Sequence, residues 1–257
     1  MSGAAARIAP TLPYALPPPE NFFAMSQHRF TLAACLVLGL LAPSFAPAAE
    51  PVPLKAGDRI VFFGDSITAG GVKPEGYITV IQEALNKKHA DKKIECIGAG
   101  IGGNKVPNLQ GRVEKDVIAK KPTLTVIYIG INDVWHQEKN PPSGTSPEKF
   151  TEGLKEVIGK LKAAGSRVVL CTPTVVGEKK TGTNKLDADL DKYSDLSRAL
   201  AKELDLPLVD LRKAFHDHLA ANNSADADKG ILTTDRVHLN KAGNQLVADT
   251  MLMTIDP

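Results

Sequence analysis

After residue 50, short apolar runs alternate along the chain with longer segments whose apolar residues recur at helical spacing. The apolar runs predict strands at residues 59–63, 94–97, 124–129, 167–172 and 207–210. The longer segments predict helices at residues 76–88, 107–120, 147–164, 187–205, 211–221 and 241–253. Regular alternation of strand and helix is typical of β-α units on a parallel sheet. We therefore predict a single α/β domain over residues 50–257.

The first 49 residues are different in kind and predict a signal peptide with an N-terminal extension. Arg29 precedes an apolar stretch at residues 31–42, and small residues follow it up to Ala49. A stretch of about 12 residues is shorter than the roughly 20 that span a bilayer. We predict cleavage that leaves a mature start near Ala49 or Glu50, and hence a secreted or periplasmic protein. The true start is open between Met1 and Met25, and a lipoprotein signal at Cys35 is a less favoured alternative.

The balance of charged residues argues against two classes of partner, nucleic acids and anionic membranes. The chain has 31 basic and 29 acidic residues, a formal net charge of +2, and the two signs are interspersed. Binding to nucleic acid or to an anionic membrane surface requires a concentrated basic patch, and none is visible in the sequence. We expect a neutral or modestly polar small molecule as the partner. The sequence leaves the oligomeric state open.

Three separated motifs together supply the groups of a nucleophilic hydrolase. Ser66 follows the first predicted strand, and Asp235 and His238 stand three residues apart before the last predicted helix. A serine hydroxyl is a weak nucleophile and needs a base, and the base in turn needs a group that fixes its tautomer. We predict Ser66 as the nucleophile, His238 as the base and Asp235 as the group that orients it.

The developing negative charge on a substrate oxygen also needs donors, which together form an oxyanion hole. Asn132 follows Gly130 at the end of the predicted strand 124–129, so its amide can lie beside Ser66 if the two strands are neighbours. The backbone N–H groups of Ser66 and of a glycine after the second strand complete the predicted set. We assign that glycine to Gly103, with Gly102 as the alternative.

Further residues near these motifs are candidates for substrate contact. Asp65 and Trp135 adjoin Ser66 and Asn132, and Trp135 suits either stacking on a sugar ring or simple packing. Two segments rich in helix and strand breakers, 136–146 and 174–185, each follow a strand. Loops after parallel strands lie at the carboxyl edge of the sheet, where such folds bind ligands. We expect both loops at the rim of the site.

The sequence favours neither a metal nor a cofactor. His216 and His218 are two residues apart in a helical segment and so point in different directions. Asp187, Asp189 and Asp191 lack the glycine and the final acidic residue of a calcium loop, and we interpret them as acids stabilised at a helix N-terminus. Two cysteines remain in the mature chain, Cys96 and Cys171, and whether they pair is open.

The motifs resemble the SGNH hydrolases, also called GDSL esterases and lipases. The resemblance covers residues 58–253. It rests on Gly64–Ser66, on Gly103 with Asn104, on Gly130–Asp133 and on Asp235–Asn240, with Arg236 standing where glycine is frequent. It implies a flavodoxin-like three-layer α/β/α sandwich with a five-stranded parallel sheet, no metal, and hydrolysis through an acyl-serine intermediate. The segments 101–107 and 130–135 are most similar to bacterial carbohydrate-esterase-like members.

We therefore expect a secreted serine esterase that removes short acyl groups, acetyl above all, from a carbohydrate or a similar small alcohol. A lysophospholipase or thioesterase of the same family is the alternative. A further alternative, of a different class, is a non-catalytic carbohydrate-binding protein on this fold.

Overall fold

A computed structural model describes residues 52–139 and 141–257. The predicted signal peptide, its cleavage site and Cys35 lie outside these residues. The domain predicted from residue 50 therefore enters the described structure at Val52.

A five-stranded, all-parallel sheet forms the centre of the domain, in the order β2-β1-β3-β4-β5. This is the flavodoxin-like order. The strands are β1 (Arg59–Gly64), β2 (Glu95–Gly100), β3 (Leu124–Tyr128), β4 (Arg167–Cys171) and β5 (Leu208–Val209). All five predicted strands are present. The interior of β1 shows why: Ile60–Phe63 are 0–1% exposed, as expected for a strand covered on both faces.

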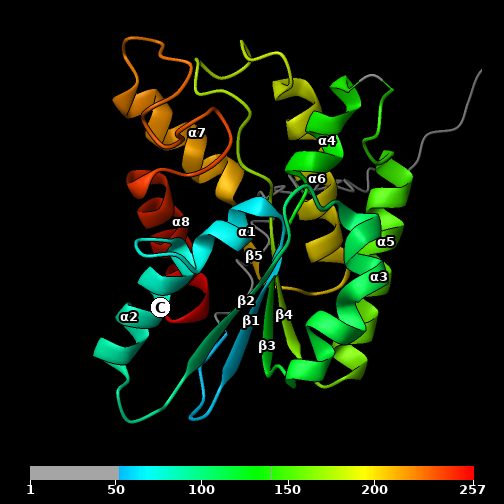
Figure 1. Cartoon of the computed structure of the whole chain (residues 1–257), viewed down its shortest axis with the longest axis vertical. Coiled ribbons are helices and arrows are strands. Elements are labelled where there is room, and N and C mark those ends of the chain that lie inside the picture. The colour runs from blue at the N-terminus through cyan, green and yellow to red at the C-terminus, as the bar shows by residue number, and fades with distance from the viewer. Residues whose placement is uncertain (1–51, 140) are drawn as a thin grey trace, which may run out of the picture. The chain divides into compact units, whose positions relative to one another are not determined.

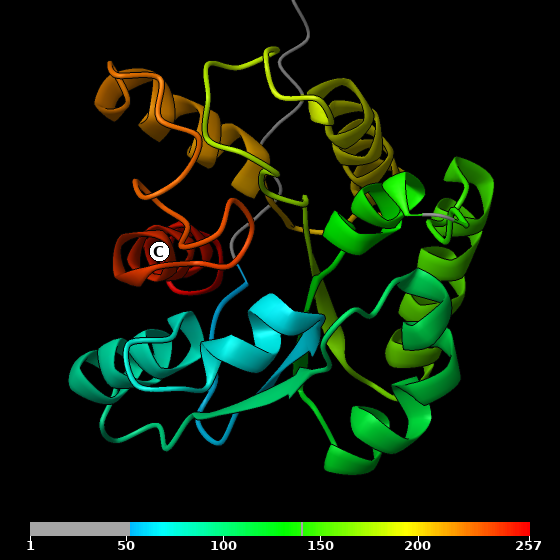
Figure 2. The same cartoon turned by 45° about the horizontal axis from the view of Figure 1, so that its top comes forward.

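Helices cover both faces of the sheet, which confirms the predicted three-layer sandwich (Figure 1). On one face lie α2 (Tyr77–Lys88), α7 (Leu211–Asn222) and α8 (Lys241–Ile255), and on the other lie α3 (Val106–Asp116), α5 (Pro147–Ala163) and α6 (Asp187–Glu203). The two groups are separated clearly in the turned view of Figure 2. Side-chain caps begin two of the predicted helices: Ser146 accepts from the Lys149 N–H, and Asn240 from the Gly243 N–H.

Short helical elements that the sequence analysis did not predict follow β1 and β3. They are α1 (Ser66–Gly71) and α4 (Ile131–Trp135), the latter continued by a 3₁₀ turn, η2 (His136–Glu138). Six and five residues are too few to show a helical period, and α1 ends in two glycines. The predicted helix 107–120 also divides, into α3 and a second 3₁₀ turn, η1 (Ile118–Lys120).

The second strand is longer than predicted because tertiary packing overrides a weak local preference. Its last residues, Gly98–Gly100, have low strand propensity, yet they continue the ladder beside β1 as far as Gly64↔Gly100. A Cβ on Gly100 would lie 2.1 Å from the Ala69 backbone nitrogen. Glycine here therefore allows α1 to pass directly over the edge of the sheet.

Asp187 lies in the first turn of α6 together with Asp189, as predicted for acids at a helix N-terminus. It has a further role that the sequence did not show: it is 2% exposed and pairs at 3.0 Å with Arg212, which is 1% exposed. Arg212 also donates to the Thr174 carbonyl oxygen at 2.7 Å and to Asp191 at 2.8 Å. One buried guanidinium thus ties the loop after β4 to α6 and α7.

The two cysteines of the domain are both free thiols. Cys96 lies on β2 and Cys171 on β4, and β1 and β3 stand between these strands. The open alternative of a disulfide is therefore excluded in this structure. Across residues 52–139 and 141–257, none of the helices has the length and apolarity needed to cross a bilayer.

Candidate active site

The nucleophile candidate, Ser66, begins α1 at the carboxyl edge of the sheet. The turn is fixed by Asp65, whose side chain caps the helix by accepting from the Ile67 N–H at 2.9 Å. Asp65 is 2% exposed, and burial raises its pKa from 3.8 to about 7. The expectation that Asp65 contacts substrate is not supported, because a buried capping carboxyl has no free surface for a ligand.

Chain segments 172 residues apart meet at Ser66. The Ser66 Oγ lies 2.9 Å from Nε2 of His238, and Nδ1 of His238 lies 2.7 Å from Oδ2 of Asp235. His238 and Asp235 have side chains 41% and 53% exposed, so the group is open to solvent and to a ligand. The structure thus brings together the three side chains that the sequence analysis named, in the order hydroxyl, imidazole, carboxylate.

Local hydrogen bonds hold Asp235 in its orientation. Its Oδ1 accepts from the backbone N–H groups of Val237 at 3.1 Å and His238 at 2.8 Å. Partial burial alone would raise the pKa of Asp235, but these bonds and the one from the His238 ring outweigh it and lower the pKa below its usual value. Asp235 is therefore ionised at neutral pH, as a partner for an imidazolium must be.

Arg236, between the acid and the base, has a backbone φ of +86°. This left-handed conformation favours glycine and costs other residues roughly 1 kcal/mol. The Arg236 side chain forms an ion pair with Asp228 at 2.9 Å, and its carbonyl oxygen accepts from the Gly177 N–H. These contacts hold the arginine in a backbone conformation that favours glycine.

A buried carboxylate that sequence reasoning missed holds the segment before Asp235. Glu178 is 0% exposed and accepts from the backbone N–H groups of Ile231 at 2.7 Å, Leu232 at 2.8 Å and Thr233. It lies in the loop after β4, one of the two loops expected at the rim of the site. Only the three-dimensional contact, 53 to 55 residues away in sequence, shows what this side chain does.

The oxyanion candidates lie at the ends of the strands that flank β1. Asn132 is the second residue of α4 and is 3% exposed. Its Nδ2 donates to the Asn104 carbonyl oxygen at 3.1 Å. Gly102 and Gly103 are both exposed. A Cβ on Gly102 would lie 4.0 Å from that of Ser66, whereas Gly103 has a φ of +73°. Both glycines therefore border the site, and Gly103 is the one whose conformation requires glycine.

Two residues that follow Asn132 differ in burial. Asp133 is 0% exposed, accepts from the Val106 N–H at 3.0 Å, and has its pKa raised to about 6 by burial. Trp135 is 37% exposed at the end of α4, with its ring 6.2 Å from that of His136. Trp135 is therefore available to a ligand beside the oxyanion candidates, while Asp133 anchors α3 to α4.

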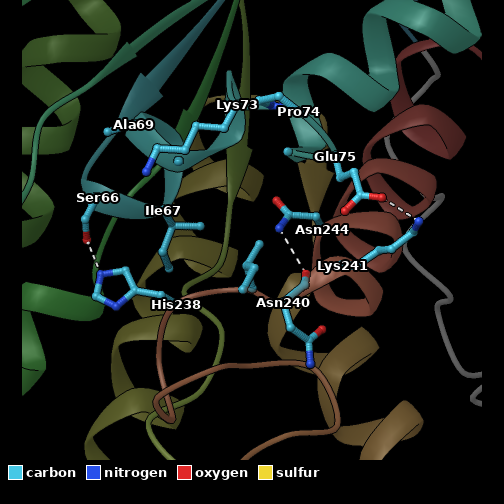
Figure 3. Close-up of a pocket in the computed structure, with 13 residues that line it drawn as sticks. Ser66, Ile67, Ala69, Lys73, Pro74, Glu75, His238, Asn240, Lys241 and Asn244 are labelled. Atoms are coloured by element: carbon cyan, nitrogen blue, oxygen red, sulfur yellow. Dashed lines mark hydrogen bonds and ion pairs between the residues drawn. The ribbon is translucent and has the colours of Figure 1, made fainter.

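A cleft of about 520 Å³ opens from Ser66 and His238 toward α2 and α8. Figure 3 shows this pair at one end and an ion pair between Glu75 and Lys241, 2.5 Å long, at the other. The walls carry further polar side chains, among them Lys73, Asn240 and Asn244. Among the described residues, no three His, Cys, Asp or Glu side chains are grouped so that they could hold a metal ion.

Comparison with known proteins places this site in a family. Residues 62–246 match the model of the GDSL-like lipase/acylhydrolase family. The crystal structure of an acetyl xylan esterase, AlAXEase, is 46% identical with a TM-score of 0.73, covering 76% of this chain and 98% of that one. The acetylxylan esterase of Geobacillus stearothermophilus is 29% identical over 214 residues, 78% of this chain and 94% of the relative.

Two other similarities bear on the site residues and on the location of the protein. Solved structures of the Geobacillus stearothermophilus enzyme include catalytic mutants in which a serine, an aspartate and a histidine are each replaced by alanine, the latter two three positions apart as Asp235 and His238 are. An uncharacterized lipoprotein of Bacillus subtilis, YqeF, is 26% identical over 218 residues, 74% of this chain and 86% of the relative.

Proposed function

The chain belongs to the GDSL-like lipase/acylhydrolase family and is an SGNH serine esterase, and on this premise we propose that it hydrolyses acetyl esters of carbohydrates outside the cytoplasm. The observation that carries the proposal is the contact of 2.9 Å between the Ser66 Oγ and the His238 Nε2, with Asp235 at 2.7 Å behind the ring. The acetylxylan esterases among its relatives support the acyl group and the class of alcohol.

In the proposed mechanism, His238 takes the proton of Ser66 as its Oγ attacks the ester carbonyl carbon. The carbonyl oxygen becomes an oxyanion, which accepts hydrogen bonds from the backbone N–H groups of Ser66 and Gly103 and from Nδ2 of Asn132. The C–O bond to the alcohol then breaks, and His238 gives its proton to the leaving oxygen. Water attacks the acyl-serine with His238 again as the base, which releases acetate and restores the Ser66 hydroxyl.

The cleft beside His238 supports a large polar alcohol and a small acyl group. The leaving oxygen must come within hydrogen-bond reach of Nε2 to receive its proton, so the alcohol extends along the side of the site where His238 lies. That side holds the cleft of about 520 Å³ with its charged and amide side chains. Such walls suit the hydroxyl groups of a sugar. Trp135, exposed at the end of α4 and three residues after Asn132, is available to stack on another part of the same substrate.

The alternatives within the family, a lysophospholipase or a thioesterase, are distinguished by the acyl group and the leaving group that they accept. A lysophospholipase needs an apolar channel for a long acyl chain, whereas an acetyl esterase needs room for a single methyl group on the acyl side of Ser66. Turnover of p-nitrophenyl acetate against longer p-nitrophenyl esters distinguishes these possibilities. We expect kcat/KM to be highest for the acetate ester. A preference for acyl chains of about eight or more carbons, as in a lipid, would contradict the proposal.

Substitution of the nucleophile tests the enzymatic reading against a binding protein on the same fold. Ser66→Ala should abolish hydrolysis, and Asn132→Ala should lower kcat by roughly 10²-fold or more. Ser224→Ala, at an exposed serine away from the site, is the matched control and should leave the rate unchanged. Unchanged hydrolysis in Ser66→Ala would refute the acyl-serine mechanism. Acetate released from acetylated polysaccharides then identifies the alcohol.

Export is part of the proposal. It is supported by the signal-peptide pattern before Glu50 and by the similarity to a bacterial lipoprotein. Expression of the full chain with mass spectrometry of the culture medium and of the periplasm tests it. We expect a mature N-terminus near Ala49 or Glu50, and full-length protein retained in the cytoplasm would contradict the prediction.

A further inference from the structure

Arg112 on α3 reaches beneath the carboxyl edge of the sheet and binds the ends of two strands. Its Nη2 donates to the Gly64 carbonyl oxygen at 2.7 Å, and its Nη1 donates to the Ala99 carbonyl oxygen at 3.0 Å. Its Nε donates to Oδ1 of Asn104 at 2.7 Å. A single side chain thus connects the last residue of β1, the end of β2 and the loop between β2 and α3.

Two of these acceptors, on Gly64 and Asn104, stand close in sequence to a proposed oxyanion donor. Gly64 precedes Ser66 by two residues, and Asn104 directly follows Gly103. The carbonyl oxygen of Asn104 accepts from Nδ2 of Asn132 at 3.1 Å. All three donors are therefore linked to the same guanidinium, although their residues lie on three different segments of the chain.

The environment of Arg112 favours arginine over any other cation. Its guanidinium carbon lies 4.5 Å from the centre of the Phe63 ring, and Asp116 accepts from Nη1 at 3.1 Å. The side chain is only 12% exposed. A planar guanidinium can stack on the ring while it donates to several acceptors around its edge, whereas a lysine ammonium has no such fixed fork.

We propose that Arg112 is the positioning residue of the oxyanion hole. It holds Gly103 and Asn132, through Asn104, in register with the Ser66 turn, through Gly64, and it does not itself touch the substrate. The inference rests on the proposed acyl-transfer mechanism. Because the donors must meet the charge that develops in the transition state, a displacement of about 1 Å is expected to reduce the rate rather than substrate binding.

Arg112→Lys keeps the positive charge and removes the fork. We expect kcat for p-nitrophenyl acetate to fall roughly 10- to 100-fold while KM stays within about twofold. Arg167→Gln is the control, since Arg167 also bridges strands, through Asp58 and the Thr123 carbonyl oxygen, but at the opposite edge of the sheet. When rates are corrected for the folded fraction, measured by circular dichroism, the control should retain the wild-type kcat.

A double-mutant cycle separates positioning from a general effect on folding. If Arg112 acts through the oxyanion donors, its substitution must cost less in the Asn132→Ala background than in the wild type. Equal fold losses in both backgrounds would overturn the proposal. This outcome is distinct from failure of the proposed function itself, which would appear as retained activity in Ser66→Ala.

A gentler variant guards against a fold that does not survive loss of Arg112. Asn104→Ala removes the acceptor of the Arg112 Nε and leaves the guanidinium in place, and Asn104→Asp retains an acceptor oxygen there. We expect Asn104→Ala to lower kcat about 10-fold with little change in KM, and Asn104→Asp to recover most of that loss. Equal rates in the two variants would show that the link from Asn104 to Arg112 does not position the site.

Discussion

Replacement of Glu178 by glutamine should destabilise the protein and disturb the segment that carries the proposed acid and base. The carboxylate is 0% exposed, and its two oxygens accept from three backbone N–H groups, those of Ile231, Leu232 and Thr233. In the amide, one oxygen is replaced by an NH2 group. At least one backbone donor then faces another donor at a side chain that is fully buried.

The size of the effect follows from these contacts. A hydrogen bond to a charged acceptor contributes about 1.5–3 kcal/mol, and a buried donor left without a partner adds a desolvation cost. We expect the free energy of unfolding to fall by about 3 kcal/mol. For a domain of this size, each kcal/mol corresponds to about 2–4 °C, so the melting temperature should fall by about 6–12 °C.

Thermal unfolding followed by circular dichroism measures this change. Hydrolysis of p-nitrophenyl acetate measures the effect on the site, at about 20 °C, where a typical domain is fully folded. The segment bound by Glu178 ends two residues before Asp235, so kcat should fall as well. The matched control is Glu203→Gln, whose carboxylate is 55% exposed and paired with Lys155 at 2.7 Å. It should change stability by less than about 0.5 kcal/mol. A melting temperature for Glu178→Gln equal to that of the control would refute the reasoning.

Three further predictions concern the backbone, the pH dependence and the thiols. Because φ at Arg236 is +86°, Arg236→Ala should be about 1 kcal/mol less stable than Arg236→Gly in urea unfolding, and equal stabilities would contradict the strain argument. Burial raises the pKa of Asp65 from 3.8 to about 7. The stability that protonated Asp65 contributes is therefore fully present below about pH 4 and is lost as the pH rises through about 7. Asp65→Asn should therefore gain stability relative to the wild type at about pH 8 and show little difference at about pH 4, and a parallel pH profile would show that Asp65 does not titrate in this way. Burial raises the pKa of Cys96 to about 12 and that of Cys171 well above its usual value, so iodoacetamide should label neither thiol in the native mature protein and both after denaturation, as mass spectrometry would reveal.

The parts of the molecule that the sequence predicted are those with a local cause. Each strand is a short apolar run between breakers, and each predicted helix has an amphipathic period long enough to be seen. Ser66 and Asn132 were found because they directly follow such strands, and Asp235 with His238 because their spacing is set by one tight turn. In these cases the residues that determine the structure are neighbours along the chain.

The elements that were missed depend on partners far away in the sequence. The helix α1 is too short to show a period, and its place over the sheet depends on Gly100 at the end of another strand. Asp187 lies at a helix N-terminus as predicted, but its burial follows only from its contact at 3.0 Å with Arg212, on another helix. Strand β2 was predicted too short because its glycines have low propensity, although the ladder with β1 continues through them.

Glu178 and Arg112 explain why a site assembled from separate loops can hold its geometry. A loop cannot fix its own backbone by secondary structure, so its N–H and carbonyl groups need partners from elsewhere. A carboxylate accepts from several N–H groups and a guanidinium donates to several acceptors, so one buried side chain of either kind can hold a whole loop. Here the carboxylate of Glu178 binds the segment before His238, and the guanidinium of Arg112 binds the segments beside Gly103 and Ser66. The base side and the oxyanion side of the proposed mechanism are thus fixed by two different charges, so substitutions at Glu178 and at Arg112 should alter the site independently.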